Sequence, residues 1–309
     1  MSFPLHLRAA KTGVVLALFL LLFALFSAAA SQATWPGRNG AIAFVRGSHI
    51  WVQLPSGKQR QLTSGDGADG EPTYSRDGRQ IAFVRYSGND SDIWVMNSDG
   101  TEQRPVTAND GPGLSEVQPA FFPGGRSLVF AQLGLAGGWT VSSIRLDGTE
   151  QRQLARRAKF PAVSPNGRWL AFTRHPGGDR IRLQDLRTGE ERQLPSGLSQ
   201  QADFSPDGRR LVFVGQRPCG GKEHLRLSIL TIGLHDPGAR MLLPTCHRNL
   251  IPYGPVWSPR GDRVLFARRD NPSGPSDARL QLLNLRGALV AGAPRHRGFE
   301  GSPSWQPLR

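Results

Sequence analysis

The sequence contains none of the short motifs that mark common catalytic and cofactor sites. It has no Gly-x-Ser-x-Gly elbow, no His-Glu-x-x-His or Cys-x-x-Cys pair and no glycine-rich phosphate loop. Its seven histidines are dispersed, and the spacing of His224, His235 and His247 matches none of the usual metal-binding patterns. We therefore expect a protein that is not an enzyme, with no catalytic residue, no metal site and no cofactor.

Helical periodicity is also missing: no segment after residue 34 sustains it. Glycine and proline together make up 61 of the 309 residues, and many of them recur at regular positions, which indicates turns rather than disorder. These two observations together predict an all-β chain.

A seven-residue motif recurs five times, and an apolar tripeptide that ends on phenylalanine follows each copy. The copies begin at Pro72, Pro119, Pro161, Ala202 and Pro255, and the fourth reads Ala-Asp-Phe-Ser-Pro-Asp-Gly. With a sixth tripeptide, Ile42-Ala-Phe44, the phenylalanines are 39, 47, 42, 41 and 53 residues apart. That period is typical of one four-stranded propeller blade.

The turn chemistry of the motif predicts where the strands lie. In Ser-Pro-Asp-Gly, the proline presets φ, the aspartate can bond the backbone and the glycine accepts a positive φ. Each motif therefore forms the turn between a first and a second strand. A third strand, a glycine turn and a short fourth strand such as Arg60–Thr63 or Arg104–Thr107 follow.

The first unit lacks its motif, which is found instead at the other end of the chain as Ser302-Pro-Ser-Trp-Gln-Pro307. We expect this segment to lie beside the strand that holds Ile42–Phe44 and to complete the first blade. The prediction is a six-bladed β-propeller of four-stranded antiparallel blades over residues 34–309, closed by its C-terminal strand. Closure would remove the open edge that a partial ring exposes.

These repeats resemble the TolB-type propeller repeat, with its Pro-x-Trp-Ser-Pro-Asp-Gly-x-x-Ile-Ala-Phe core and its later Arg-x-Leu-Thr segment. The resemblance covers roughly residues 36–309 and implies a periplasmic protein that binds other proteins. We expect no counterpart of the α/β domain that precedes the propeller in TolB, because the repeats begin within about ten residues of the signal-like first 33 residues. Similar repeats also form the body of certain oligosaccharide lyases, which keeps a carbohydrate-binding or carbohydrate-processing role as the alternative.

The first 33 residues have the pattern of a secretory signal. Arg8 and Lys11 precede the apolar run Val14–Phe26, and small residues follow it. Cleavage after Ala30 or after Ala33 fits, and a retained N-terminal anchor helix is the alternative. We expect an exported protein, periplasmic or extracellular, that contacts a membrane only if this segment is uncleaved.

The channel mouth is the first candidate site, because ligand sites in propellers form where the starts of the innermost strands converge. The side chains near these starts are the candidate ligand or partner contacts: Glu71, Glu116, Gln118, Gln200, Gln201, Tyr253 and Glu300.

A basic face on the fifth and sixth blades is the second candidate site. The chain carries a formal charge of +14, and residues 160–309 hold 22 basic and 12 acidic side chains. Loops predicted on one face of these blades carry Arg217, Lys222, Arg248, Arg295 and Arg297. Such a face would suit a polyanion or an acidic partner, although a solvated arginine-rich surface explains the same charge.

The two cysteines, Cys219 and Cys246, fall in loops predicted on one face of the fifth blade. In an exported chain this placement favours a disulfide, which would contribute about 3.5 kcal/mol in the chain-entropy model; two unpaired thiols are the alternative. We expect a monomeric binding scaffold whose partner is an envelope protein or a polyanionic envelope polymer. Nucleic acid is not expected, since no aromatic residues are interleaved with the basic ones.

Overall fold

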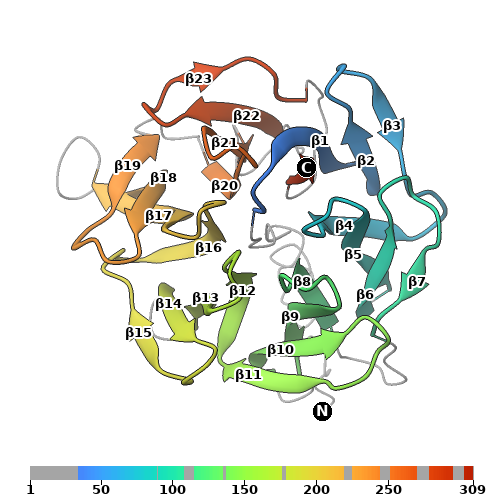
Figure 1. Cartoon of the computed structure of the whole chain (residues 1–309), viewed down its shortest axis with the longest axis horizontal. Coiled ribbons are helices and arrows are strands. Elements are labelled where there is room, and N and C mark those ends of the chain that lie inside the picture. Colours follow the sequence, from blue (N-terminus) through green and yellow to red (C-terminus); the bar gives the residue numbers. More distant parts are fainter. Residues whose placement is uncertain are drawn as a thin grey trace, which may run out of the picture.

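The chain forms a closed ring of six four-stranded blades around a central axis, which we call the channel (Figure 1). A parallel pairing of Ser91 with Ser115 joins the second and third blades into one eight-stranded sheet. The computed structural model describes residues 34–88, 90–107, 115–134, 137–175, 179–218, 225–243, 251–269, 278–294 and 303–308. Within these ranges the regular structure is entirely β, and no helix long and apolar enough to cross a membrane occurs. The expected six-bladed all-β propeller is confirmed. The predicted N-terminal signal, residues 1–33, lies outside the described residues.

The strands follow the chain blade by blade. The first blade contains β1 (Arg38–Arg46), β2 (His49–Gln53), β3 (Gln59–Gln61) and β24 (Ser304–Leu308). The second contains β4 (Ala68–Tyr74), β5 (Gln80–Ser87), β6 (Asp90–Asn97) and β7 (Arg104–Pro105). The third contains β8 (Ser115–Phe121), β9 (Ser127–Leu133), β10 (Trp139–Arg145) and β11 (Arg152–Arg156).

The second half of the ring repeats this order. The fourth blade contains β12 (Ala158–Val163), β13 (Trp169–Arg174), β14 (Arg180–Asp185) and β15 (Glu191–Gln193). The fifth contains β16 (Ser199–Phe204), β17 (Arg210–Pro218), β18 (Leu225–Gly233) and β19 (Arg240–Leu243). The sixth contains β20 (Ile251–Trp257), β21 (Arg263–Arg269), β22 (Arg279–Asn284) and β23 (Leu289–Val290).

The C-terminal strand closes the ring as the sequence predicts. β24 is the innermost strand of the first blade and pairs antiparallel with β1, where Trp305 lies opposite Ile42. The Trp305 Nε1–H donates to the Gly40 carbonyl at 3.2 Å. The Gln306 amide donates to the Gly78 carbonyl of the second blade at 2.8 Å. β24 is therefore bonded both within its own blade and to the next one.

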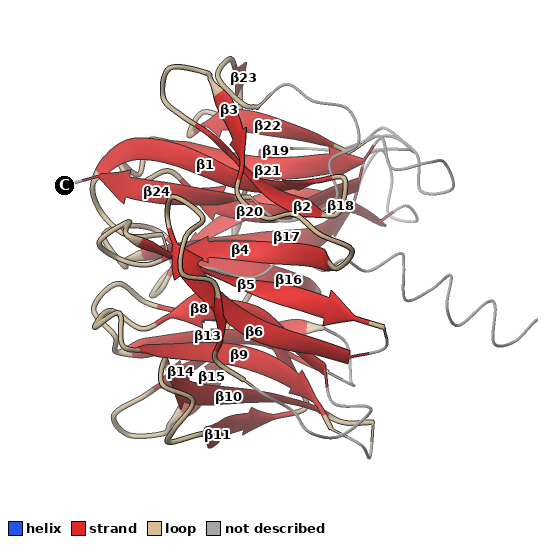
Figure 2. Cartoon of the chain, turned by 90° about the vertical axis from the view of Figure 1, so that its right-hand side faces the viewer, coloured by secondary structure: helices blue, strands red, loops and turns tan. Residues whose placement is uncertain are grey.

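The turns between first and second strands, which we call the inner turns, owe their shape to the repeat motif. In the second blade the Ser75 hydroxyl donates to Asp77 Oδ1 at 2.7 Å, and the Arg79 N–H donates to the same oxygen at 3.1 Å. The Ser75 Oγ in turn accepts the Gln80 N–H at 3.0 Å, and Gly78 has a φ of 70°. Ser164 with Asn166 and Ser205 with Asp207 make the same bonds. The inner turns lie together on one side of the ring, on the left of Figure 2, and we call that side the turn face.

The hydrophobic core is divided into six clusters, each formed mainly between two neighbouring blades. The repeated phenylalanines are at most 1% exposed and lie in these clusters: Phe44, Phe83, Phe130, Phe172, Phe213 and Phe266. Phe44, for example, packs with Leu265 of the sixth blade, and Phe83 with Ile50 of the first. Each blade buries its faces only against its neighbours, as expected for a repeat fold.

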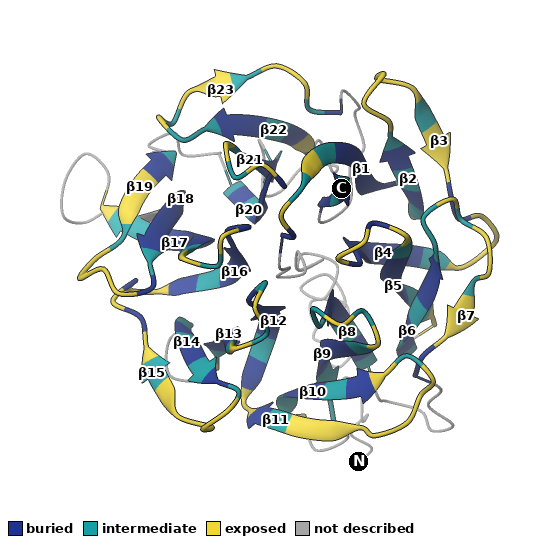
Figure 3. Cartoon of the chain, in the orientation of Figure 1, coloured by how far each residue is buried: buried dark blue, intermediate teal, exposed yellow. Residues whose placement is uncertain are grey.

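Arginines on the outermost strands join the blades a second time, at the rim. Arg60 donates to the carbonyl of Asp99 in the next blade at 3.0 Å, and Arg240 donates to the carbonyl of Leu285 at 2.9 Å. Arg104 and Arg192 make the equivalent bonds to Leu146 and Leu234. We call these four bonds the outer seam. The rim is also the most exposed part of the blades, as Figure 3 shows.

Candidate functional site

The innermost strands carry an irregularity at the same height in five of the six blades. In each of these strands the pairing register shifts, as between Gly70 and Thr73 of β4. At each shift one residue has a positive φ of 52–60°: Glu71, Gln118, Phe160, Gln201 and Gly254. For the four residues other than glycine this conformation is unfavourable, so other interactions must hold it.

Side chains at these positions supply part of that stabilisation by bonding the backbone of the next blade. Glu71 Oε2 accepts the Gln118 N–H at 2.5 Å, and Gln118 Oε1 accepts the Phe160 N–H at 2.7 Å. Gln201 Oε1 accepts the Gly254 N–H at 3.0 Å. We call these three buried bonds the inner seam. Phe160 and Gly254 have no polar side chain with which to continue it.

Glu71 is the one ionisable member of the inner seam. Its side chain is 5% exposed. Burial raises the pKa of this carboxyl from 4.5 to about 8, against the opposing effect of the Gln118 N–H. At neutral pH, Glu71 is therefore largely protonated, and like the glutamines it accepts a hydrogen bond without carrying a charge.

The segment before β1 crosses the channel near the turn face. Trp35 is 2% exposed and packs in the cluster between the second and third blades, where its Nε1–H donates to the Tyr74 carbonyl at 3.2 Å. Its neighbour Thr34 bonds the opposite side of the ring: the hydroxyl lies 2.8 Å from Asp203 Oδ2 in β16 and 3.0 Å from the Trp257 carbonyl in β20. Residues 34 and 35 thus form a bridge across the channel, from the second blade to the fifth and sixth.

Asp203 is a fully buried carboxyl that faces this segment. Its Oδ2 also accepts the Trp257 N–H at 2.7 Å. Burial raises the pKa of Asp203 well above its ordinary value, opposed by bonds from the N–H groups of Trp257, Thr34 and Phe204 and from the Thr34 hydroxyl. Oδ1 is buried and has no hydrogen bond of normal geometry within the described part of the chain.

A collar of arginines surrounds the bridged end of the channel. The residue directly after the turn glycine is an exposed arginine in four inner turns, and three further exposed arginines lie within inner turns or begin β1. We call this set the arginine collar: Arg38, Arg76, Arg79, Arg126, Arg168, Arg209 and Arg260. The inner turns also hold carboxylates, those of Asp77, Asp207 and Asp262, which accept hydrogen bonds from serines within the turns. Arg168 of the collar pairs with Asp185 at 2.9 Å.

The structure places the residues predicted at the channel mouth in different environments. Glu71, Gln118 and Gln201 come together in the inner seam, as described above. Glu116 is fully buried and accepts the side-chain N–H of Gln132 at 2.7 Å. Gln200 is half-buried in β16, and Tyr253 is half-buried in β20 with the Arg269 guanidinium 5.8 Å from its ring centre. A ligand-binding role for these residues stays a prediction.

Most of the predicted basic face lies outside the described residues, namely Lys222, Arg248, Arg295 and Arg297, together with Glu300 and both cysteines of the predicted disulfide, Cys219 and Cys246. Arg217 is described, and its guanidinium donates to the carbonyl of Ser196 at 3.2 Å and of Gln216 at 2.9 Å. This arginine therefore binds its own blade, whether or not it also contacts a partner.

In the described ranges, no group of three or more His, Cys, Asp or Glu side chains is arranged to hold a metal ion.

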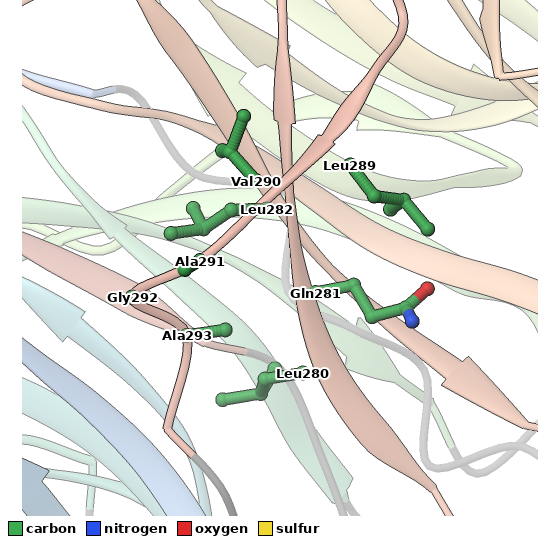
Figure 4. Close-up of a pocket in the computed structure, with 8 residues that line it drawn as sticks. All are labelled: Leu280, Gln281, Leu282, Leu289, Val290, Ala291, Gly292 and Ala293. Carbon is green, nitrogen blue, oxygen red and sulfur yellow. The ribbon is translucent and has the colours of Figure 1, made fainter.

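A small groove of about 180 Å³ lies on the rim of the sixth blade beside β22 and β23 (Figure 4). It is lined mainly by apolar side chains, those of Leu280, Leu282, Leu289, Val290 and Ala293 among them.

The sequence did not lead us to predict the arginine collar or the channel bridge; the predicted basic face comprised other loops of the fifth and sixth blades. A signal for the collar is visible in the sequence, because Gly-Arg recurs at Gly78, Gly125, Gly167 and Gly208. For the bridge, the sequence offers only a tryptophan two residues after the signal-like segment. The pairing of Thr34 with Asp203, 169 residues apart, leaves no local pattern.

Comparison with known proteins agrees with this geometry. Residues 46–186 match the family described as the TolB beta propeller domain. The chain is 34% identical over 145 residues to the "Protein TolB homolog" of Chlorobium chlorochromatii (strain CaD3), covering 45% of this chain and 32% of that protein. It is 28% identical over 177 residues to the "Uncharacterized peptidase YuxL" of Bacillus subtilis (strain 168), covering 54% of this chain and 25% of that protein. The matches thus span only a quarter to a third of these two relatives.

Among solved structures, TolB from Acinetobacter baumannii superimposes with a TM-score of 0.72 at 19% identity, covering 98% of this chain and 74% of that one. An identity this low shows the fold alone. The family match thus covers residues 46–186, and the strand order and the superposition show that the ring as a whole has a TolB-like propeller fold.

Proposed function

We propose that this protein is an exported, non-enzymatic binding scaffold of the bacterial cell envelope, and that it holds an acidic protein partner on its turn face. The arginine collar is the observation that carries the proposal. Seven exposed arginines surround one end of the channel, where they outnumber Asp77, Asp207 and Asp262 of the inner turns, and one of the seven, Arg168, is paired with Asp185. An excess of charge of one sign on one surface attracts an oppositely charged partner and speeds its association.

The collar is mounted on rigid turns, which lowers the entropic cost of binding. The bonds of Ser75 and Asp77 fix the second-blade turn between Arg76 and Arg79, and those of Ser205 and Asp207 fix the turn before Arg209. Partial burial works to raise the pKa of Asp77, but the hydrogen bonds from Ser75 and Arg79 outweigh it and hold that pKa below its ordinary value. A partner therefore meets guanidinium groups on a preorganised backbone.

Bidentate bonding explains why arginine suits this role. A guanidinium presents a planar fork that matches a carboxylate, so acidic side chains are the natural complement of the collar. The signal-like first 33 residues and the likeness to proteins named TolB support an envelope location. The relative named as a peptidase matches this chain over only a quarter of its own length, and we do not extend its activity to this protein.

Crosslinking capture from an envelope extract tests the proposal. The bait is the full chain, exported by a bacterial host. The collar variant replaces Arg76, Arg79, Arg209 and Arg260 with glutamine, and the matched control replaces four exposed rim arginines with glutamine: Arg60, Arg104, Arg152 and Arg240. Both variants lose the same charge; the control also gives up three exposed outer-seam bonds, which contribute little individually.

We expect the native chain and the rim control to capture the same acidic protein, and the collar variant to lose it at least tenfold. Binding should also weaken as salt rises, because exposed charges are screened. Equal capture by the collar variant would refute the proposal. Loss of capture in an Arg295→Ala/Arg297→Ala variant instead would assign binding to the predicted basic face, and capture of a polysaccharide would favour the carbohydrate-binding alternative.

A further inference from the structure

The strongest unexplained feature of the molecule is the buried Asp203 carboxyl beside Thr34. Thr34 is 5% exposed and Asp203 is fully buried. The Thr34 hydroxyl lies 2.8 Å from Asp203 Oδ2. A hydrogen bond from the Thr34 backbone N–H is among the influences that lower the pKa of this carboxyl. The nitrogen of residue 34 and a buried carboxyl therefore lie together inside the channel.

Asp203 has no cationic partner in the described part of the chain: no arginine, lysine or histidine there forms an ion pair with it or shifts its pKa. Burying a carboxylate without a countercharge is costly, so such a group either stays protonated or acquires a partner. A peptide nitrogen at Thr34 offers one hydrogen. A free α-ammonium at the same position would offer three, together with a positive charge.

The sequence before Thr34 allows that ammonium to be made. Residues 31–33 read Ser-Gln-Ala, with a small residue at the first and third positions. This is the small-x-small pattern that precedes the cleavage site of a secretory signal. Cleavage after Ala30 fits the same pattern equally well, so the sequence alone does not choose between the two sites.

We propose that the chain is processed between Ala33 and Thr34, and that the α-amino group released on Thr34 forms a buried ion pair with the Asp203 carboxylate. The inference rests on the export that forms part of the proposed function. The reaction is hydrolysis by the exporting cell's signal peptidase. Water adds its hydroxyl to the Ala33 carbonyl carbon, the Ala33–Thr34 peptide bond breaks, and the amine leaves with a proton and takes up a second at neutral pH.

The pair would fasten the first residues of the mature chain into the ring. Thr34 would be held to the fifth blade by charge as well as by its hydroxyl, and Trp35 would be held to the second blade by its bond to the Tyr74 carbonyl. Processing would thus complete the channel bridge and compensate the buried Asp203.

Intact mass spectrometry of the full chain exported by a bacterial host is the first test. We expect a single product that begins at Thr34. A product that begins at Ser31, or an uncut chain, would overturn the proposal.

A double-mutant cycle tests the ion pair itself. Ala33→Leu removes the small residue that the Ala33–Thr34 cut requires. Whether this variant is then cut after Ala30 or stays uncut, Thr34 remains an amide. Asp203→Asn is made in both backgrounds, and each melting temperature is measured after the N-terminus has been checked by mass.

We expect Asp203→Asn to lower the melting temperature on the order of 5–10 °C in the chain that begins at Thr34, and by less than half as much in the Ala33→Leu background. Equal losses in both backgrounds would refute the pair. Asp69→Asn is the control, because Asp69 pairs with Arg85 at 2.8 Å. The drop in melting temperature that it causes should be the same whether or not the chain begins at Thr34. A chain that begins at Thr34 but captures no partner would defeat the proposed function and leave this inference standing.

Discussion

The inner and outer seams join the same blades by the same kind of bond in opposite surroundings. In the inner seam Glu71, Gln118 and Gln201 accept backbone N–H groups next to the channel, and all three side chains are at most 5% exposed. In the outer seam arginines such as Arg60 donate to backbone carbonyls at the rim, where water reaches both partners. A buried polar group left without its partner is costly, whereas an exposed one turns to water.

This difference indicates which part of the ring holds its geometry and which part can vary. The inner seam keeps four residues other than glycine in a left-handed conformation, so its bonds and the backbone strain depend on each other. The outer seam adds exposed contacts that contribute little individually. These interblade bonds also explain why the outermost strands carry Arg60, Arg104 and Arg192, with no need for a bound ligand to account for them. Five predictions test the comparison, from the largest expected effect to the smallest.

Removal of residues 304–309 should have the largest effect, because it deletes β24, the innermost strand of the first blade. Trp305 and the bonds of Gln306 to the second blade are lost with it. We expect the chain to lose its cooperative thermal transition, as followed by circular dichroism. Melting behaviour unchanged from the full chain would contradict the closure.

Trp35→Ala should destabilise the protein by about 3–5 kcal/mol, because it empties a fully packed site at the bridged end of the channel. Urea unfolding measures the change. Trp51→Ala is the comparison, since Trp51 is half-buried beneath Arg46 and should cost clearly less. Equal losses would mean that the bridge is not packed as described.

Glu71→Gln should change how stability depends on pH. The folded pKa of about 8 lies above the ordinary value of 4.5, so the stabilisation from the protonated group is complete below about pH 4.5 and is lost as pH rises to about 8. Between these limits the native chain should lose about 1.4 kcal/mol per pH unit relative to the glutamine variant. Parallel stability profiles from pH 5 to 9 would show that Glu71 does not titrate in this way.

Gln201→Ala should cost about 1–3 kcal/mol, since it leaves the buried Gly254 N–H without its acceptor. Gln200→Ala is the matched control, because Gln200 is the half-buried neighbour outside the inner seam. Chemical denaturation compares the two variants. A larger loss of stability for Gln200→Ala than for Gln201→Ala would contradict the role of Gln201 in the inner seam.

Arg60→Ala should have the smallest effect, about 0.2–1 kcal/mol, because its bond to the Asp99 carbonyl is exposed. The same denaturation experiment measures it. A loss as large as that of Gln201→Ala would overturn the contrast between the two seams.

Much of the fold could be read from the sequence because its signals are local. Ser-Pro-Asp-Gly fixes each inner turn through bonds within a few residues, and the phenylalanine of each second strand recurs once per blade. Even the closing strand was readable, since the Trp305 motif is the copy that the first blade lacks. The candidate site was read less well. Glu71, Gln118 and Gln201 were singled out, but nothing local showed that their side chains bond the next blade, 42–53 residues away.

The sequence by itself determined the number of blades, the order of strands and the closure of the ring, because each rests on a repeated pattern of apolar residues and turn residues. Only the tertiary structure decided that Thr34 and Trp35 bridge the channel, that Asp203 faces them, and that the turn arginines gather into one collar. Those features depend on which blades face each other across the axis. That relation arises when the ring closes, so no short stretch of sequence contains it.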